Sequence, residues 1–74
     1  MKLGIYQHSK TGKLYKVLGL AKHSETLEDL VVYETQYDNP TSKLWVRPKS
    51  MFIEKVVING KKVPRFTYID KLET

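Results

Sequence analysis

Short runs rich in β-branched, aromatic and other apolar residues recur along the chain at about ten-residue intervals, with polar turns between them. No segment keeps the 3.6-residue apolar period of an amphipathic helix, so the pattern predicts an all-β protein. In the strongest run, residues 29–37, alternation places Val31 and Tyr33 on one face and Leu30 and Val32 on the other. We expect strands over residues 4–8, 13–22, 29–37, 43–47, 52–58 and 61–63, with residues 65–69 as a last edge strand or a tail.

Glycine, asparagine and proline residues mark the turns between these runs. Asn59-Gly60 is the strongest hairpin signal, because both residues accept the positive φ of a type I′ turn. Gly19 interrupts the long second run and indicates a bulge or a sharp bend. Pro48 cannot donate a ladder hydrogen bond, so it ends the fourth run, and residues 48–51 then form a single tight turn.

The length of 74 residues predicts one domain, residues 1–74, with residues 67–74 as a tail or edge segment. Five to six short antiparallel strands are too few for an immunoglobulin-sized sandwich, whereas a strongly bent barrel closes its own edges at this size. A one-turn helix before the fifth strand is typical of an SH3-like barrel. The OB-fold is the alternative, but it usually carries a longer helix between its third and fourth strands.

The composition bears on the cellular compartment in which we expect the protein. The chain has no cysteine, which excludes disulfides and thiol chemistry and fits a reducing environment. Its longest apolar run, residues 17–21, is far shorter than the ~20 residues of a membrane-spanning helix. No apolar signal core follows Met1. We therefore expect a soluble cytoplasmic protein with no membrane partner.

The positive charge is concentrated in the second half of the chain. The formal net charge is +5, and residues 38–74 carry eight Lys or Arg against four Asp or Glu, a net +4. Such an excess favours anionic partners through long-range attraction. Solvated lysines on a small soluble domain account for the same composition.

Several sequence pieces together resemble a known family. The most specific are His-Ser-Glu-Thr at residues 23–26 and Trp-Val-Arg-Pro at residues 45–48. With the pieces at 4–8, 15–21, 30–33, 51–52 and 63–66, the chain resembles the small bacterial proteins called domain of unknown function 1653. This resemblance implies a small SH3-like barrel and implies no activity. The loop at residues 38–43 and the residues after 66 lie outside it.

A ligand site is expected where aromatic residues meet an arginine. An aromatic pair stacks on a planar ligand while a neighbouring guanidinium holds an anionic group through two hydrogen bonds. We expect the ligand, small and planar or anionic, to lie between this group and the polar turn after residue 22. In the alternative, the tryptophan is a core residue and the arginine pairs with Glu25, Glu28 or Glu54. The candidate ligand-binding residues are His23, Ser24, Glu25, Thr26, Tyr33, Trp45 and Arg47.

Nucleic-acid binding is the alternative function. The basic residues of the second half, next to Phe66 and Tyr68, are typical of a surface that binds single-stranded nucleic acid. Lysines on an edge hairpin also discourage strand addition, which explains them without any ligand. The candidate nucleic-acid contacts are Lys49, Lys61, Lys62 and Arg65, with Arg47 beside them.

Metal binding and catalysis find little support in the sequence. His23, Glu25 and Glu28, with His8, would suit Zn²⁺ or Mn²⁺, but their spacing matches no structural zinc pattern. Hydroxyls in this turn equally well satisfy backbone donors. Ser24 beside His23 is no catalytic dyad, because neighbouring side chains on an extended chain point apart. We therefore expect a binding module with no metal, no cofactor and no enzymatic activity, and the sequence leaves the oligomeric state open.

Overall fold

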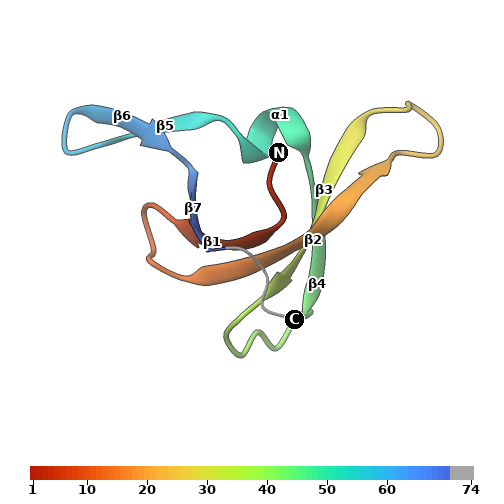
Figure 1. Ribbon diagram of the computed structural model, residues 1–74, viewed down its shortest axis with the longest axis horizontal. Coiled ribbons are helices and arrows are strands. Elements are labelled where there is room, and N and C mark those ends of the chain that lie inside the picture. The colour runs from red at the N-terminus through yellow and green to blue at the C-terminus, as the bar shows by residue number, and fades with distance from the viewer. Residues whose placement is uncertain (71–74) are drawn as a thin grey trace.

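The computed structural model describes residues 1–70 and confirms an all-β architecture (Figure 1). Within these residues it contains seven strands and one short helix. The elements are β1 (Gly4–His8), β2 (Leu14–Lys22), β3 (Asp29–Thr35), β4 (Leu44–Pro48), α1 (Lys49–Phe52), β5 (Lys55–Ile58), β6 (Lys61–Pro64) and β7 (Phe66–Asp70).

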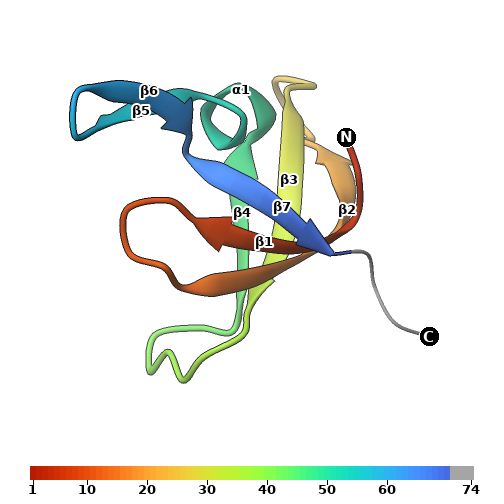
Figure 2. The same ribbon diagram turned by 60° about the vertical axis from the view of Figure 1, so that its left-hand side comes forward.

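Five of the strands form one antiparallel sheet in the order β4-β3-β2-β1-β7, and β5 and β6 form a separate hairpin. Figure 2 shows β7 running beside β1 while the β5–β6 hairpin projects away from the sheet. The sheet is not closed, because its two edge strands, β4 and β7, do not pair with each other. The prediction that the edges close on each other is therefore wrong; aromatic side chains fill the space between α1 and β7 instead.

Two local predictions are confirmed. The register of the β2–β3 ladder shifts between Val17 and Gly19, which is the bulge expected in the middle of the long second strand. Asn59 and Gly60 have φ values of 51° and 77° and connect β5 to β6, as a type I′ hairpin turn requires.

The predicted element boundaries are wrong around the helix. Phe52 does not open the fifth strand; it is the last residue of α1, and β5 begins only at Lys55. The helix starts directly after Pro48, which has no N–H to donate and whose φ of −51° is compatible with a helix start. The strand count rises to seven because residues 66–70 pair with β1 as an edge strand. Residues 71–74 of the predicted tail lie outside the described residues.

The core is small and mostly aromatic. Phe52 and Val31 are 1% and 0% exposed, which confirms them as core residues. The rings of Phe52 and Phe66 stack with a centroid distance of 4.2 Å and an interplanar angle of 2°. This stack joins α1 to β7, two elements separated by the whole β5–β6 hairpin. The buried apolar residues are Tyr6, Val17, Val31, Tyr33, Phe52 and Phe66.

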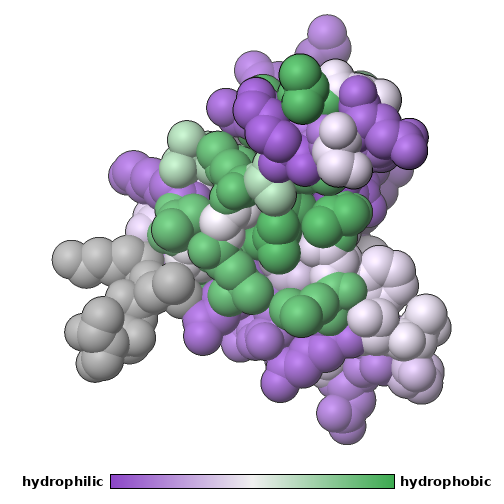
Figure 3. Space-filling model, turned by 90° about the vertical axis from the view of Figure 1, so that its right-hand side faces the viewer, coloured by the Kyte–Doolittle hydropathy of each residue, from purple (hydrophilic) through white to green (hydrophobic). Residues whose placement is uncertain are grey.

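The opposite face of the sheet leaves apolar side chains in contact with solvent. Val32 lies opposite Val46 in the β3–β4 register, and Val31 and Tyr33 on either side of Val32 are buried. Alternation therefore turns Val46 outward, where it is 58% exposed. Figure 3 shows apolar side chains gathered in the middle of one side of the molecule, with hydrophilic side chains above and below. No helix among residues 1–70 is long and apolar enough to cross a membrane.

The aromatic stack predicts a large cost for truncating Phe52. Phe52→Ala should lower the free energy of unfolding by about 3–5 kcal/mol, since it removes one of two stacked core rings. That is a large part of the ~5–15 kcal/mol available to a small domain. Denaturant titration measures it, with Ile53→Ala as control, because Ile53 is the next residue and is 56% exposed. Equal stability of the two variants would contradict the role given to the stack.

Candidate functional site

A shallow pocket of about 190 Å³ lies on the core-facing side of β2, β3 and β4. Tyr33 lies opposite Trp45 in the β3–β4 register, and Arg47, two residues further along β4, points to the same face. Three of the predicted ligand residues are thus brought together. The residues of this arginine–tyrosine pocket are Tyr15, Tyr33, Tyr37, Asn39, Trp45 and Arg47.

Arg47 is the only strongly charged group of the pocket. It is half-buried, and its guanidinium carbon lies 5.5 Å from the centroid of the Phe66 ring. Within residues 1–70 the ion pairs are Lys22–Asp29 and Arg65–Glu54, so Arg47 has no carboxylate partner. The alternative in which Arg47 pairs with Glu25, Glu28 or Glu54 is therefore wrong within residues 1–70. A half-buried guanidinium with free donors is chemically suited to an anion supplied from outside.

The three tyrosines of the pocket contact one another along one side of it. The hydroxyls of Tyr15 and Tyr37 lie 3.0 Å apart and share a hydrogen bond, and the Tyr15 and Tyr33 rings meet edge to face at 5.5 Å. Burial, and then the hydrogen bond with Tyr37, raise the pKa of Tyr15 well above its ordinary value. A tyrosine hydroxyl is already neutral at physiological pH, so the raised pKa only extends the pH range over which Tyr15 keeps its proton.

Trp45 is neither fully core nor fully exposed. Its indole is half-buried and packs against the core cluster, and its Nε1–H donates a 3.0 Å hydrogen bond to the Ser42 carbonyl. The N–H is therefore used within the protein. What the indole offers to a ligand is apolar surface rather than a donor.

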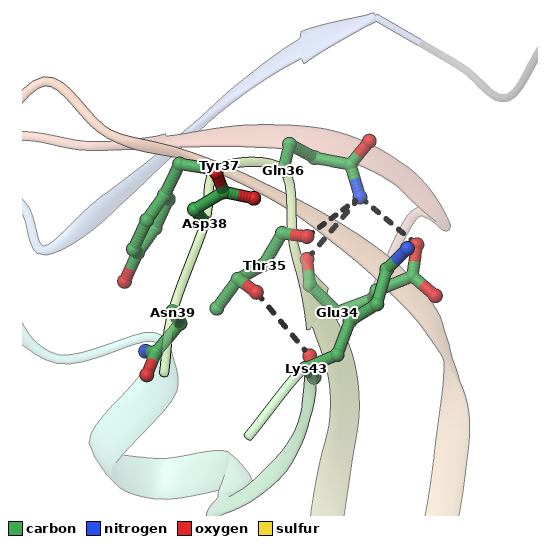
Figure 4. Close-up of a pocket in the computed structure, with 7 residues that line it drawn as sticks. All are labelled: Glu34, Thr35, Gln36, Tyr37, Asp38, Asn39 and Lys43. Carbon is green, nitrogen blue, oxygen red and sulfur yellow. Dashed lines mark hydrogen bonds between the residues drawn. The ribbon is translucent and has the colours of Figure 1, made fainter. Parts of the chain in front are cut away.

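A second, more polar depression of about 370 Å³ shares two residues with the arginine–tyrosine pocket, Tyr37 and Asn39 (Figure 4). On its other side the Gln36 amide donates hydrogen bonds to the backbone carbonyl and the side chain of Glu34. Because Tyr37 and Asn39 line both depressions, the loop after β3 shapes both. The sequence prediction omitted these two residues and Tyr15, whose grouping depends on the tertiary fold.

The predicted residues of the His23–Glu28 turn do not line the arginine–tyrosine pocket. They form the β2–β3 turn, where His23 Nδ1 accepts hydrogen bonds from the backbone N–H groups of Glu25 and Thr26 at 3.1 and 3.3 Å. Thr26 Oγ1 accepts another from the Glu28 N–H at 3.2 Å. The Thr26 hydroxyl thus satisfies a backbone donor, as the alternative in the sequence analysis expected. The role of the imidazole was not predicted, and the Ser24 hydroxyl makes no hydrogen bond within residues 1–70. Ser24 and Glu25 are exposed.

The β1–β2 turn repeats this arrangement at residues 8–13. His8 Nδ1 accepts from the N–H groups of Lys10 and Thr11, and Thr11 Oγ1 accepts from the N–H of Lys13. The fifth residue of each turn has positive φ, 75° at Gly12 and 62° at Leu27. The sequences His-Ser-Lys-Thr-Gly-Lys and His-Ser-Glu-Thr-Leu-Glu show the repeat directly, a signal that our sequence analysis missed.

The four predicted nucleic-acid contacts lie in different places. Lys61 and Lys62 begin β6 and are exposed, whereas Lys49 begins α1 and lines a depression with Glu28 and Asp29. The guanidinium of Arg65 lies 3.7 Å from a Glu54 oxygen, and its buried Nε has no hydrogen-bond partner among the described residues. The four candidates thus come from the start of α1, the start of β6 and the residue between β6 and β7, and of these Arg65 is paired with Glu54.

The metal alternative has no geometric support within residues 1–70. No group of three or more His, Asp or Glu side chains gathers there in a way that could hold an ion. His8 and His23 lie in turns at opposite ends of β2, so the two side chains cannot bind the same metal ion.

The sequence matches the family described as "Protein of unknown function (DUF1653)" over residues 4–68. This chain belongs to the DUF1653 family. A crystal structure of a DUF1653 protein from Bordetella bronchiseptica is similar, with a TM-score of 0.90 and 32% sequence identity. The similarity covers 100% of this chain and 94% of that one. A comparison with curated proteins gave no match. The family resemblance expected from the sequence is thus confirmed.

One pH prediction concerns His8 of this DUF1653 protein. Its ring meets Phe66 edge to face at 5.0 Å, and its Nδ1 must be unprotonated to accept the two turn hydrogen bonds. Burial, followed by the charges of Arg65, Arg47 and Lys10, lowers the pKa of His8. A lowered folded-state pKa gives stability that is complete above the unfolded value of about 6.5 and is lost as the pH falls below it.

We therefore expect the thermal unfolding midpoint to decrease when the pH is lowered from 7.5 to 5. His8→Asn should make this decrease smaller. The Asn side-chain oxygen keeps an acceptor for the turn but does not titrate. His8→Ala is the companion variant, which should be less stable than His8→Asn at both pH values because it has no acceptor. A His8→Asn variant with the same pH dependence as the natural protein would contradict this role of His8.

Proposed function

We propose that this DUF1653 protein is a non-enzymatic binding module that holds a small planar anionic ligand in the arginine–tyrosine pocket. The observation that carries the proposal is the state of Arg47, half-buried against Phe66 with no carboxylate partner within residues 1–70. A half-buried cation without a counter-charge has lost part of its hydration, and an incoming anion offsets that loss through ionic hydrogen bonds. The ligand would supply that charge.

The pocket's other residues define the rest of the ligand. A guanidinium binds carboxylate or phosphate through two parallel hydrogen bonds, which fixes orientation as well as charge. Rings of Tyr15, Tyr33 and Trp45 in the same pocket offer apolar and π surface to a flat group. A volume of about 190 Å³ limits the enclosed part to one small ring system. Aromatic carboxylates and nucleoside monophosphates combine both features.

We also propose that the fold is an open variant of the SH3-like barrel. The support is the strand order along the chain, the one-turn helix directly before β5 and the Phe52–Phe66 stack across the open side. In such small domains, ligands use loops held on a rigid sheet. The pocket has this position, between the sheet face and the loop that carries Tyr37 and Asn39. A cytoplasmic location stays a prediction from the sequence.

Arg47→Gln should weaken binding of the best ligand by at least about tenfold. The variant keeps polar atoms near Phe66 but removes the charge, and hydrogen bonds to charged groups contribute about 1.5–3 kcal/mol. A thermal-shift screen of aromatic carboxylates and nucleoside monophosphates identifies the ligand, and Trp45 fluorescence then gives the dissociation constant. Lys43→Gln, an equal charge change outside this pocket, is the control. Equal losses in the two variants, or no ligand in the screen, would overturn the proposal.

A further inference from the structure

A larger groove of about 540 Å³ runs between the β1–β2 turn and the β5–β6 hairpin. These two segments project from the same side of the molecule in both ribbon views (Figures 1 and 2). Ile58 and Val63 of the hairpin supply apolar walls, and Gln7, Asn59 and Thr67 supply uncharged polar groups. An open groove between two projecting segments suits an extended chain better than a compact ligand.

The rims of the groove are positively charged. Lys61 of the hairpin lines the groove, and Lys10 and Lys13 lie exposed on the β1–β2 turn beside it. Lys62 is exposed too, but alternation along β6 turns it to the other face of the hairpin. Among residues 1–70, no carboxylate lines the groove. The repeated turn at the other end of β2 has Glu25 and Glu28 at the positions of Lys10 and Lys13, so the cations belong to the sequence of this turn and not to its geometry.

The groove lies close to the arginine–tyrosine pocket, although the two share no lining residue. His8 lines the groove and Arg47 lines the pocket, and both contact the same Phe66 ring, at 5.0 and 5.5 Å. Lys13 makes a second connection, because its Nζ lies 4.6 Å from the centroid of Tyr37, which is part of the pocket wall. A polyanion in the groove therefore reaches a site suited to a flat ring.

We propose that the groove binds the backbone of a single-stranded nucleic acid, with one base in the arginine–tyrosine pocket. Single strands are bound by cations along the phosphates and by aromatic faces that stack on bases. An acidic peptide would satisfy the lysines but would leave the aromatic pocket without a planar group. The base-binding end of this inference rests on the proposed function, whereas the groove stands on its own contacts.

The test uses the full chain with three probes: a fluorescein-labelled decathymidylate, thymidine monophosphate and a decaglutamate peptide. Decathymidylate affinity should fall with salt, with a log–log slope of about −0.7 for each phosphate contact. Lys10→Gln/Lys61→Gln should flatten the slope by about 0.7 per lysine and leave monophosphate binding unchanged. Lys16→Gln/Lys62→Gln is the matched control, since Lys16 lies on β2, Lys62 points to the other face of the hairpin, and neither lines the groove.

Each outcome separates the groove from the pocket. Oligonucleotide binding that survives Arg47→Gln but is weakened by Lys10→Gln/Lys61→Gln supports the groove and overturns the pocket. Monophosphate binding without oligonucleotide binding at low salt overturns the groove and keeps the pocket. Equal flattening by the control pair, or decaglutamate bound as tightly as decathymidylate, also overturns the inference, in favour of diffuse charge or an acidic peptide respectively.

Discussion

The stacked rings of Phe52 and Phe66 are the contact on which this structure depends. A 74-residue chain without cysteine has only a small core, and here six buried apolar residues form it. Phe66 also meets the rings of Tyr15 and Tyr33, at 5.4 and 6.1 Å, so one side chain of β7 contacts α1, β2 and β3. Because the sheet does not close by hydrogen bonds, these ring contacts hold its open side together.

The same ring organises the candidate site. One cation, Arg47, lies near it, and a second ionisable group, His8, meets its edge. The arginine–Phe66 contact contributes on the order of 0.5–2 kcal/mol, which offsets part of the desolvation of a half-buried guanidinium. Arg47 is held this way without a carboxylate partner within residues 1–70, and no acceptor there takes its side-chain hydrogen bonds. Core packing and proposed binding are therefore properties of one cluster.

Local features of the fold were predictable from the sequence, because each depends on a few neighbouring residues. The Asn59-Gly60 turn follows from two residues that accept positive φ, and a glycine within a strand run often accompanies a bulge such as the one between Val17 and Gly19. The assignment of Phe52 to a strand failed because an apolar run of this length is compatible with either element, and the ring's partner lies in β7. The prediction that the sheet edges close on each other failed for a related reason, since the pairing of edge strands is decided by tertiary contacts.

The candidate site was predictable only in part. Tyr33, Trp45 and Arg47 were grouped correctly because β3 and β4 are neighbours and their alternation is regular. Tyr15 and Tyr37 were missed because their hydroxyl contact joins residues 22 positions apart. The polar turn at residues 23–28 drew attention through its unusual composition, which its hydrogen bonds now explain as turn chemistry repeated from residues 8–13.

The central proposal is that Arg47, which lies over Phe66 and has no carboxylate partner within residues 1–70, is the ligand-binding group of this protein. Nuclear magnetic resonance tests it directly through the Arg47 Nε–H signal in a ¹⁵N-labelled sample titrated with thymidine monophosphate and an aromatic carboxylate. We predict that this signal sharpens and shifts in proportion to occupancy, together with side-chain signals of Tyr15 and Tyr37. Shifts confined to the hairpin lysines, or an Arg47 signal that is unchanged at saturation, would contradict the account.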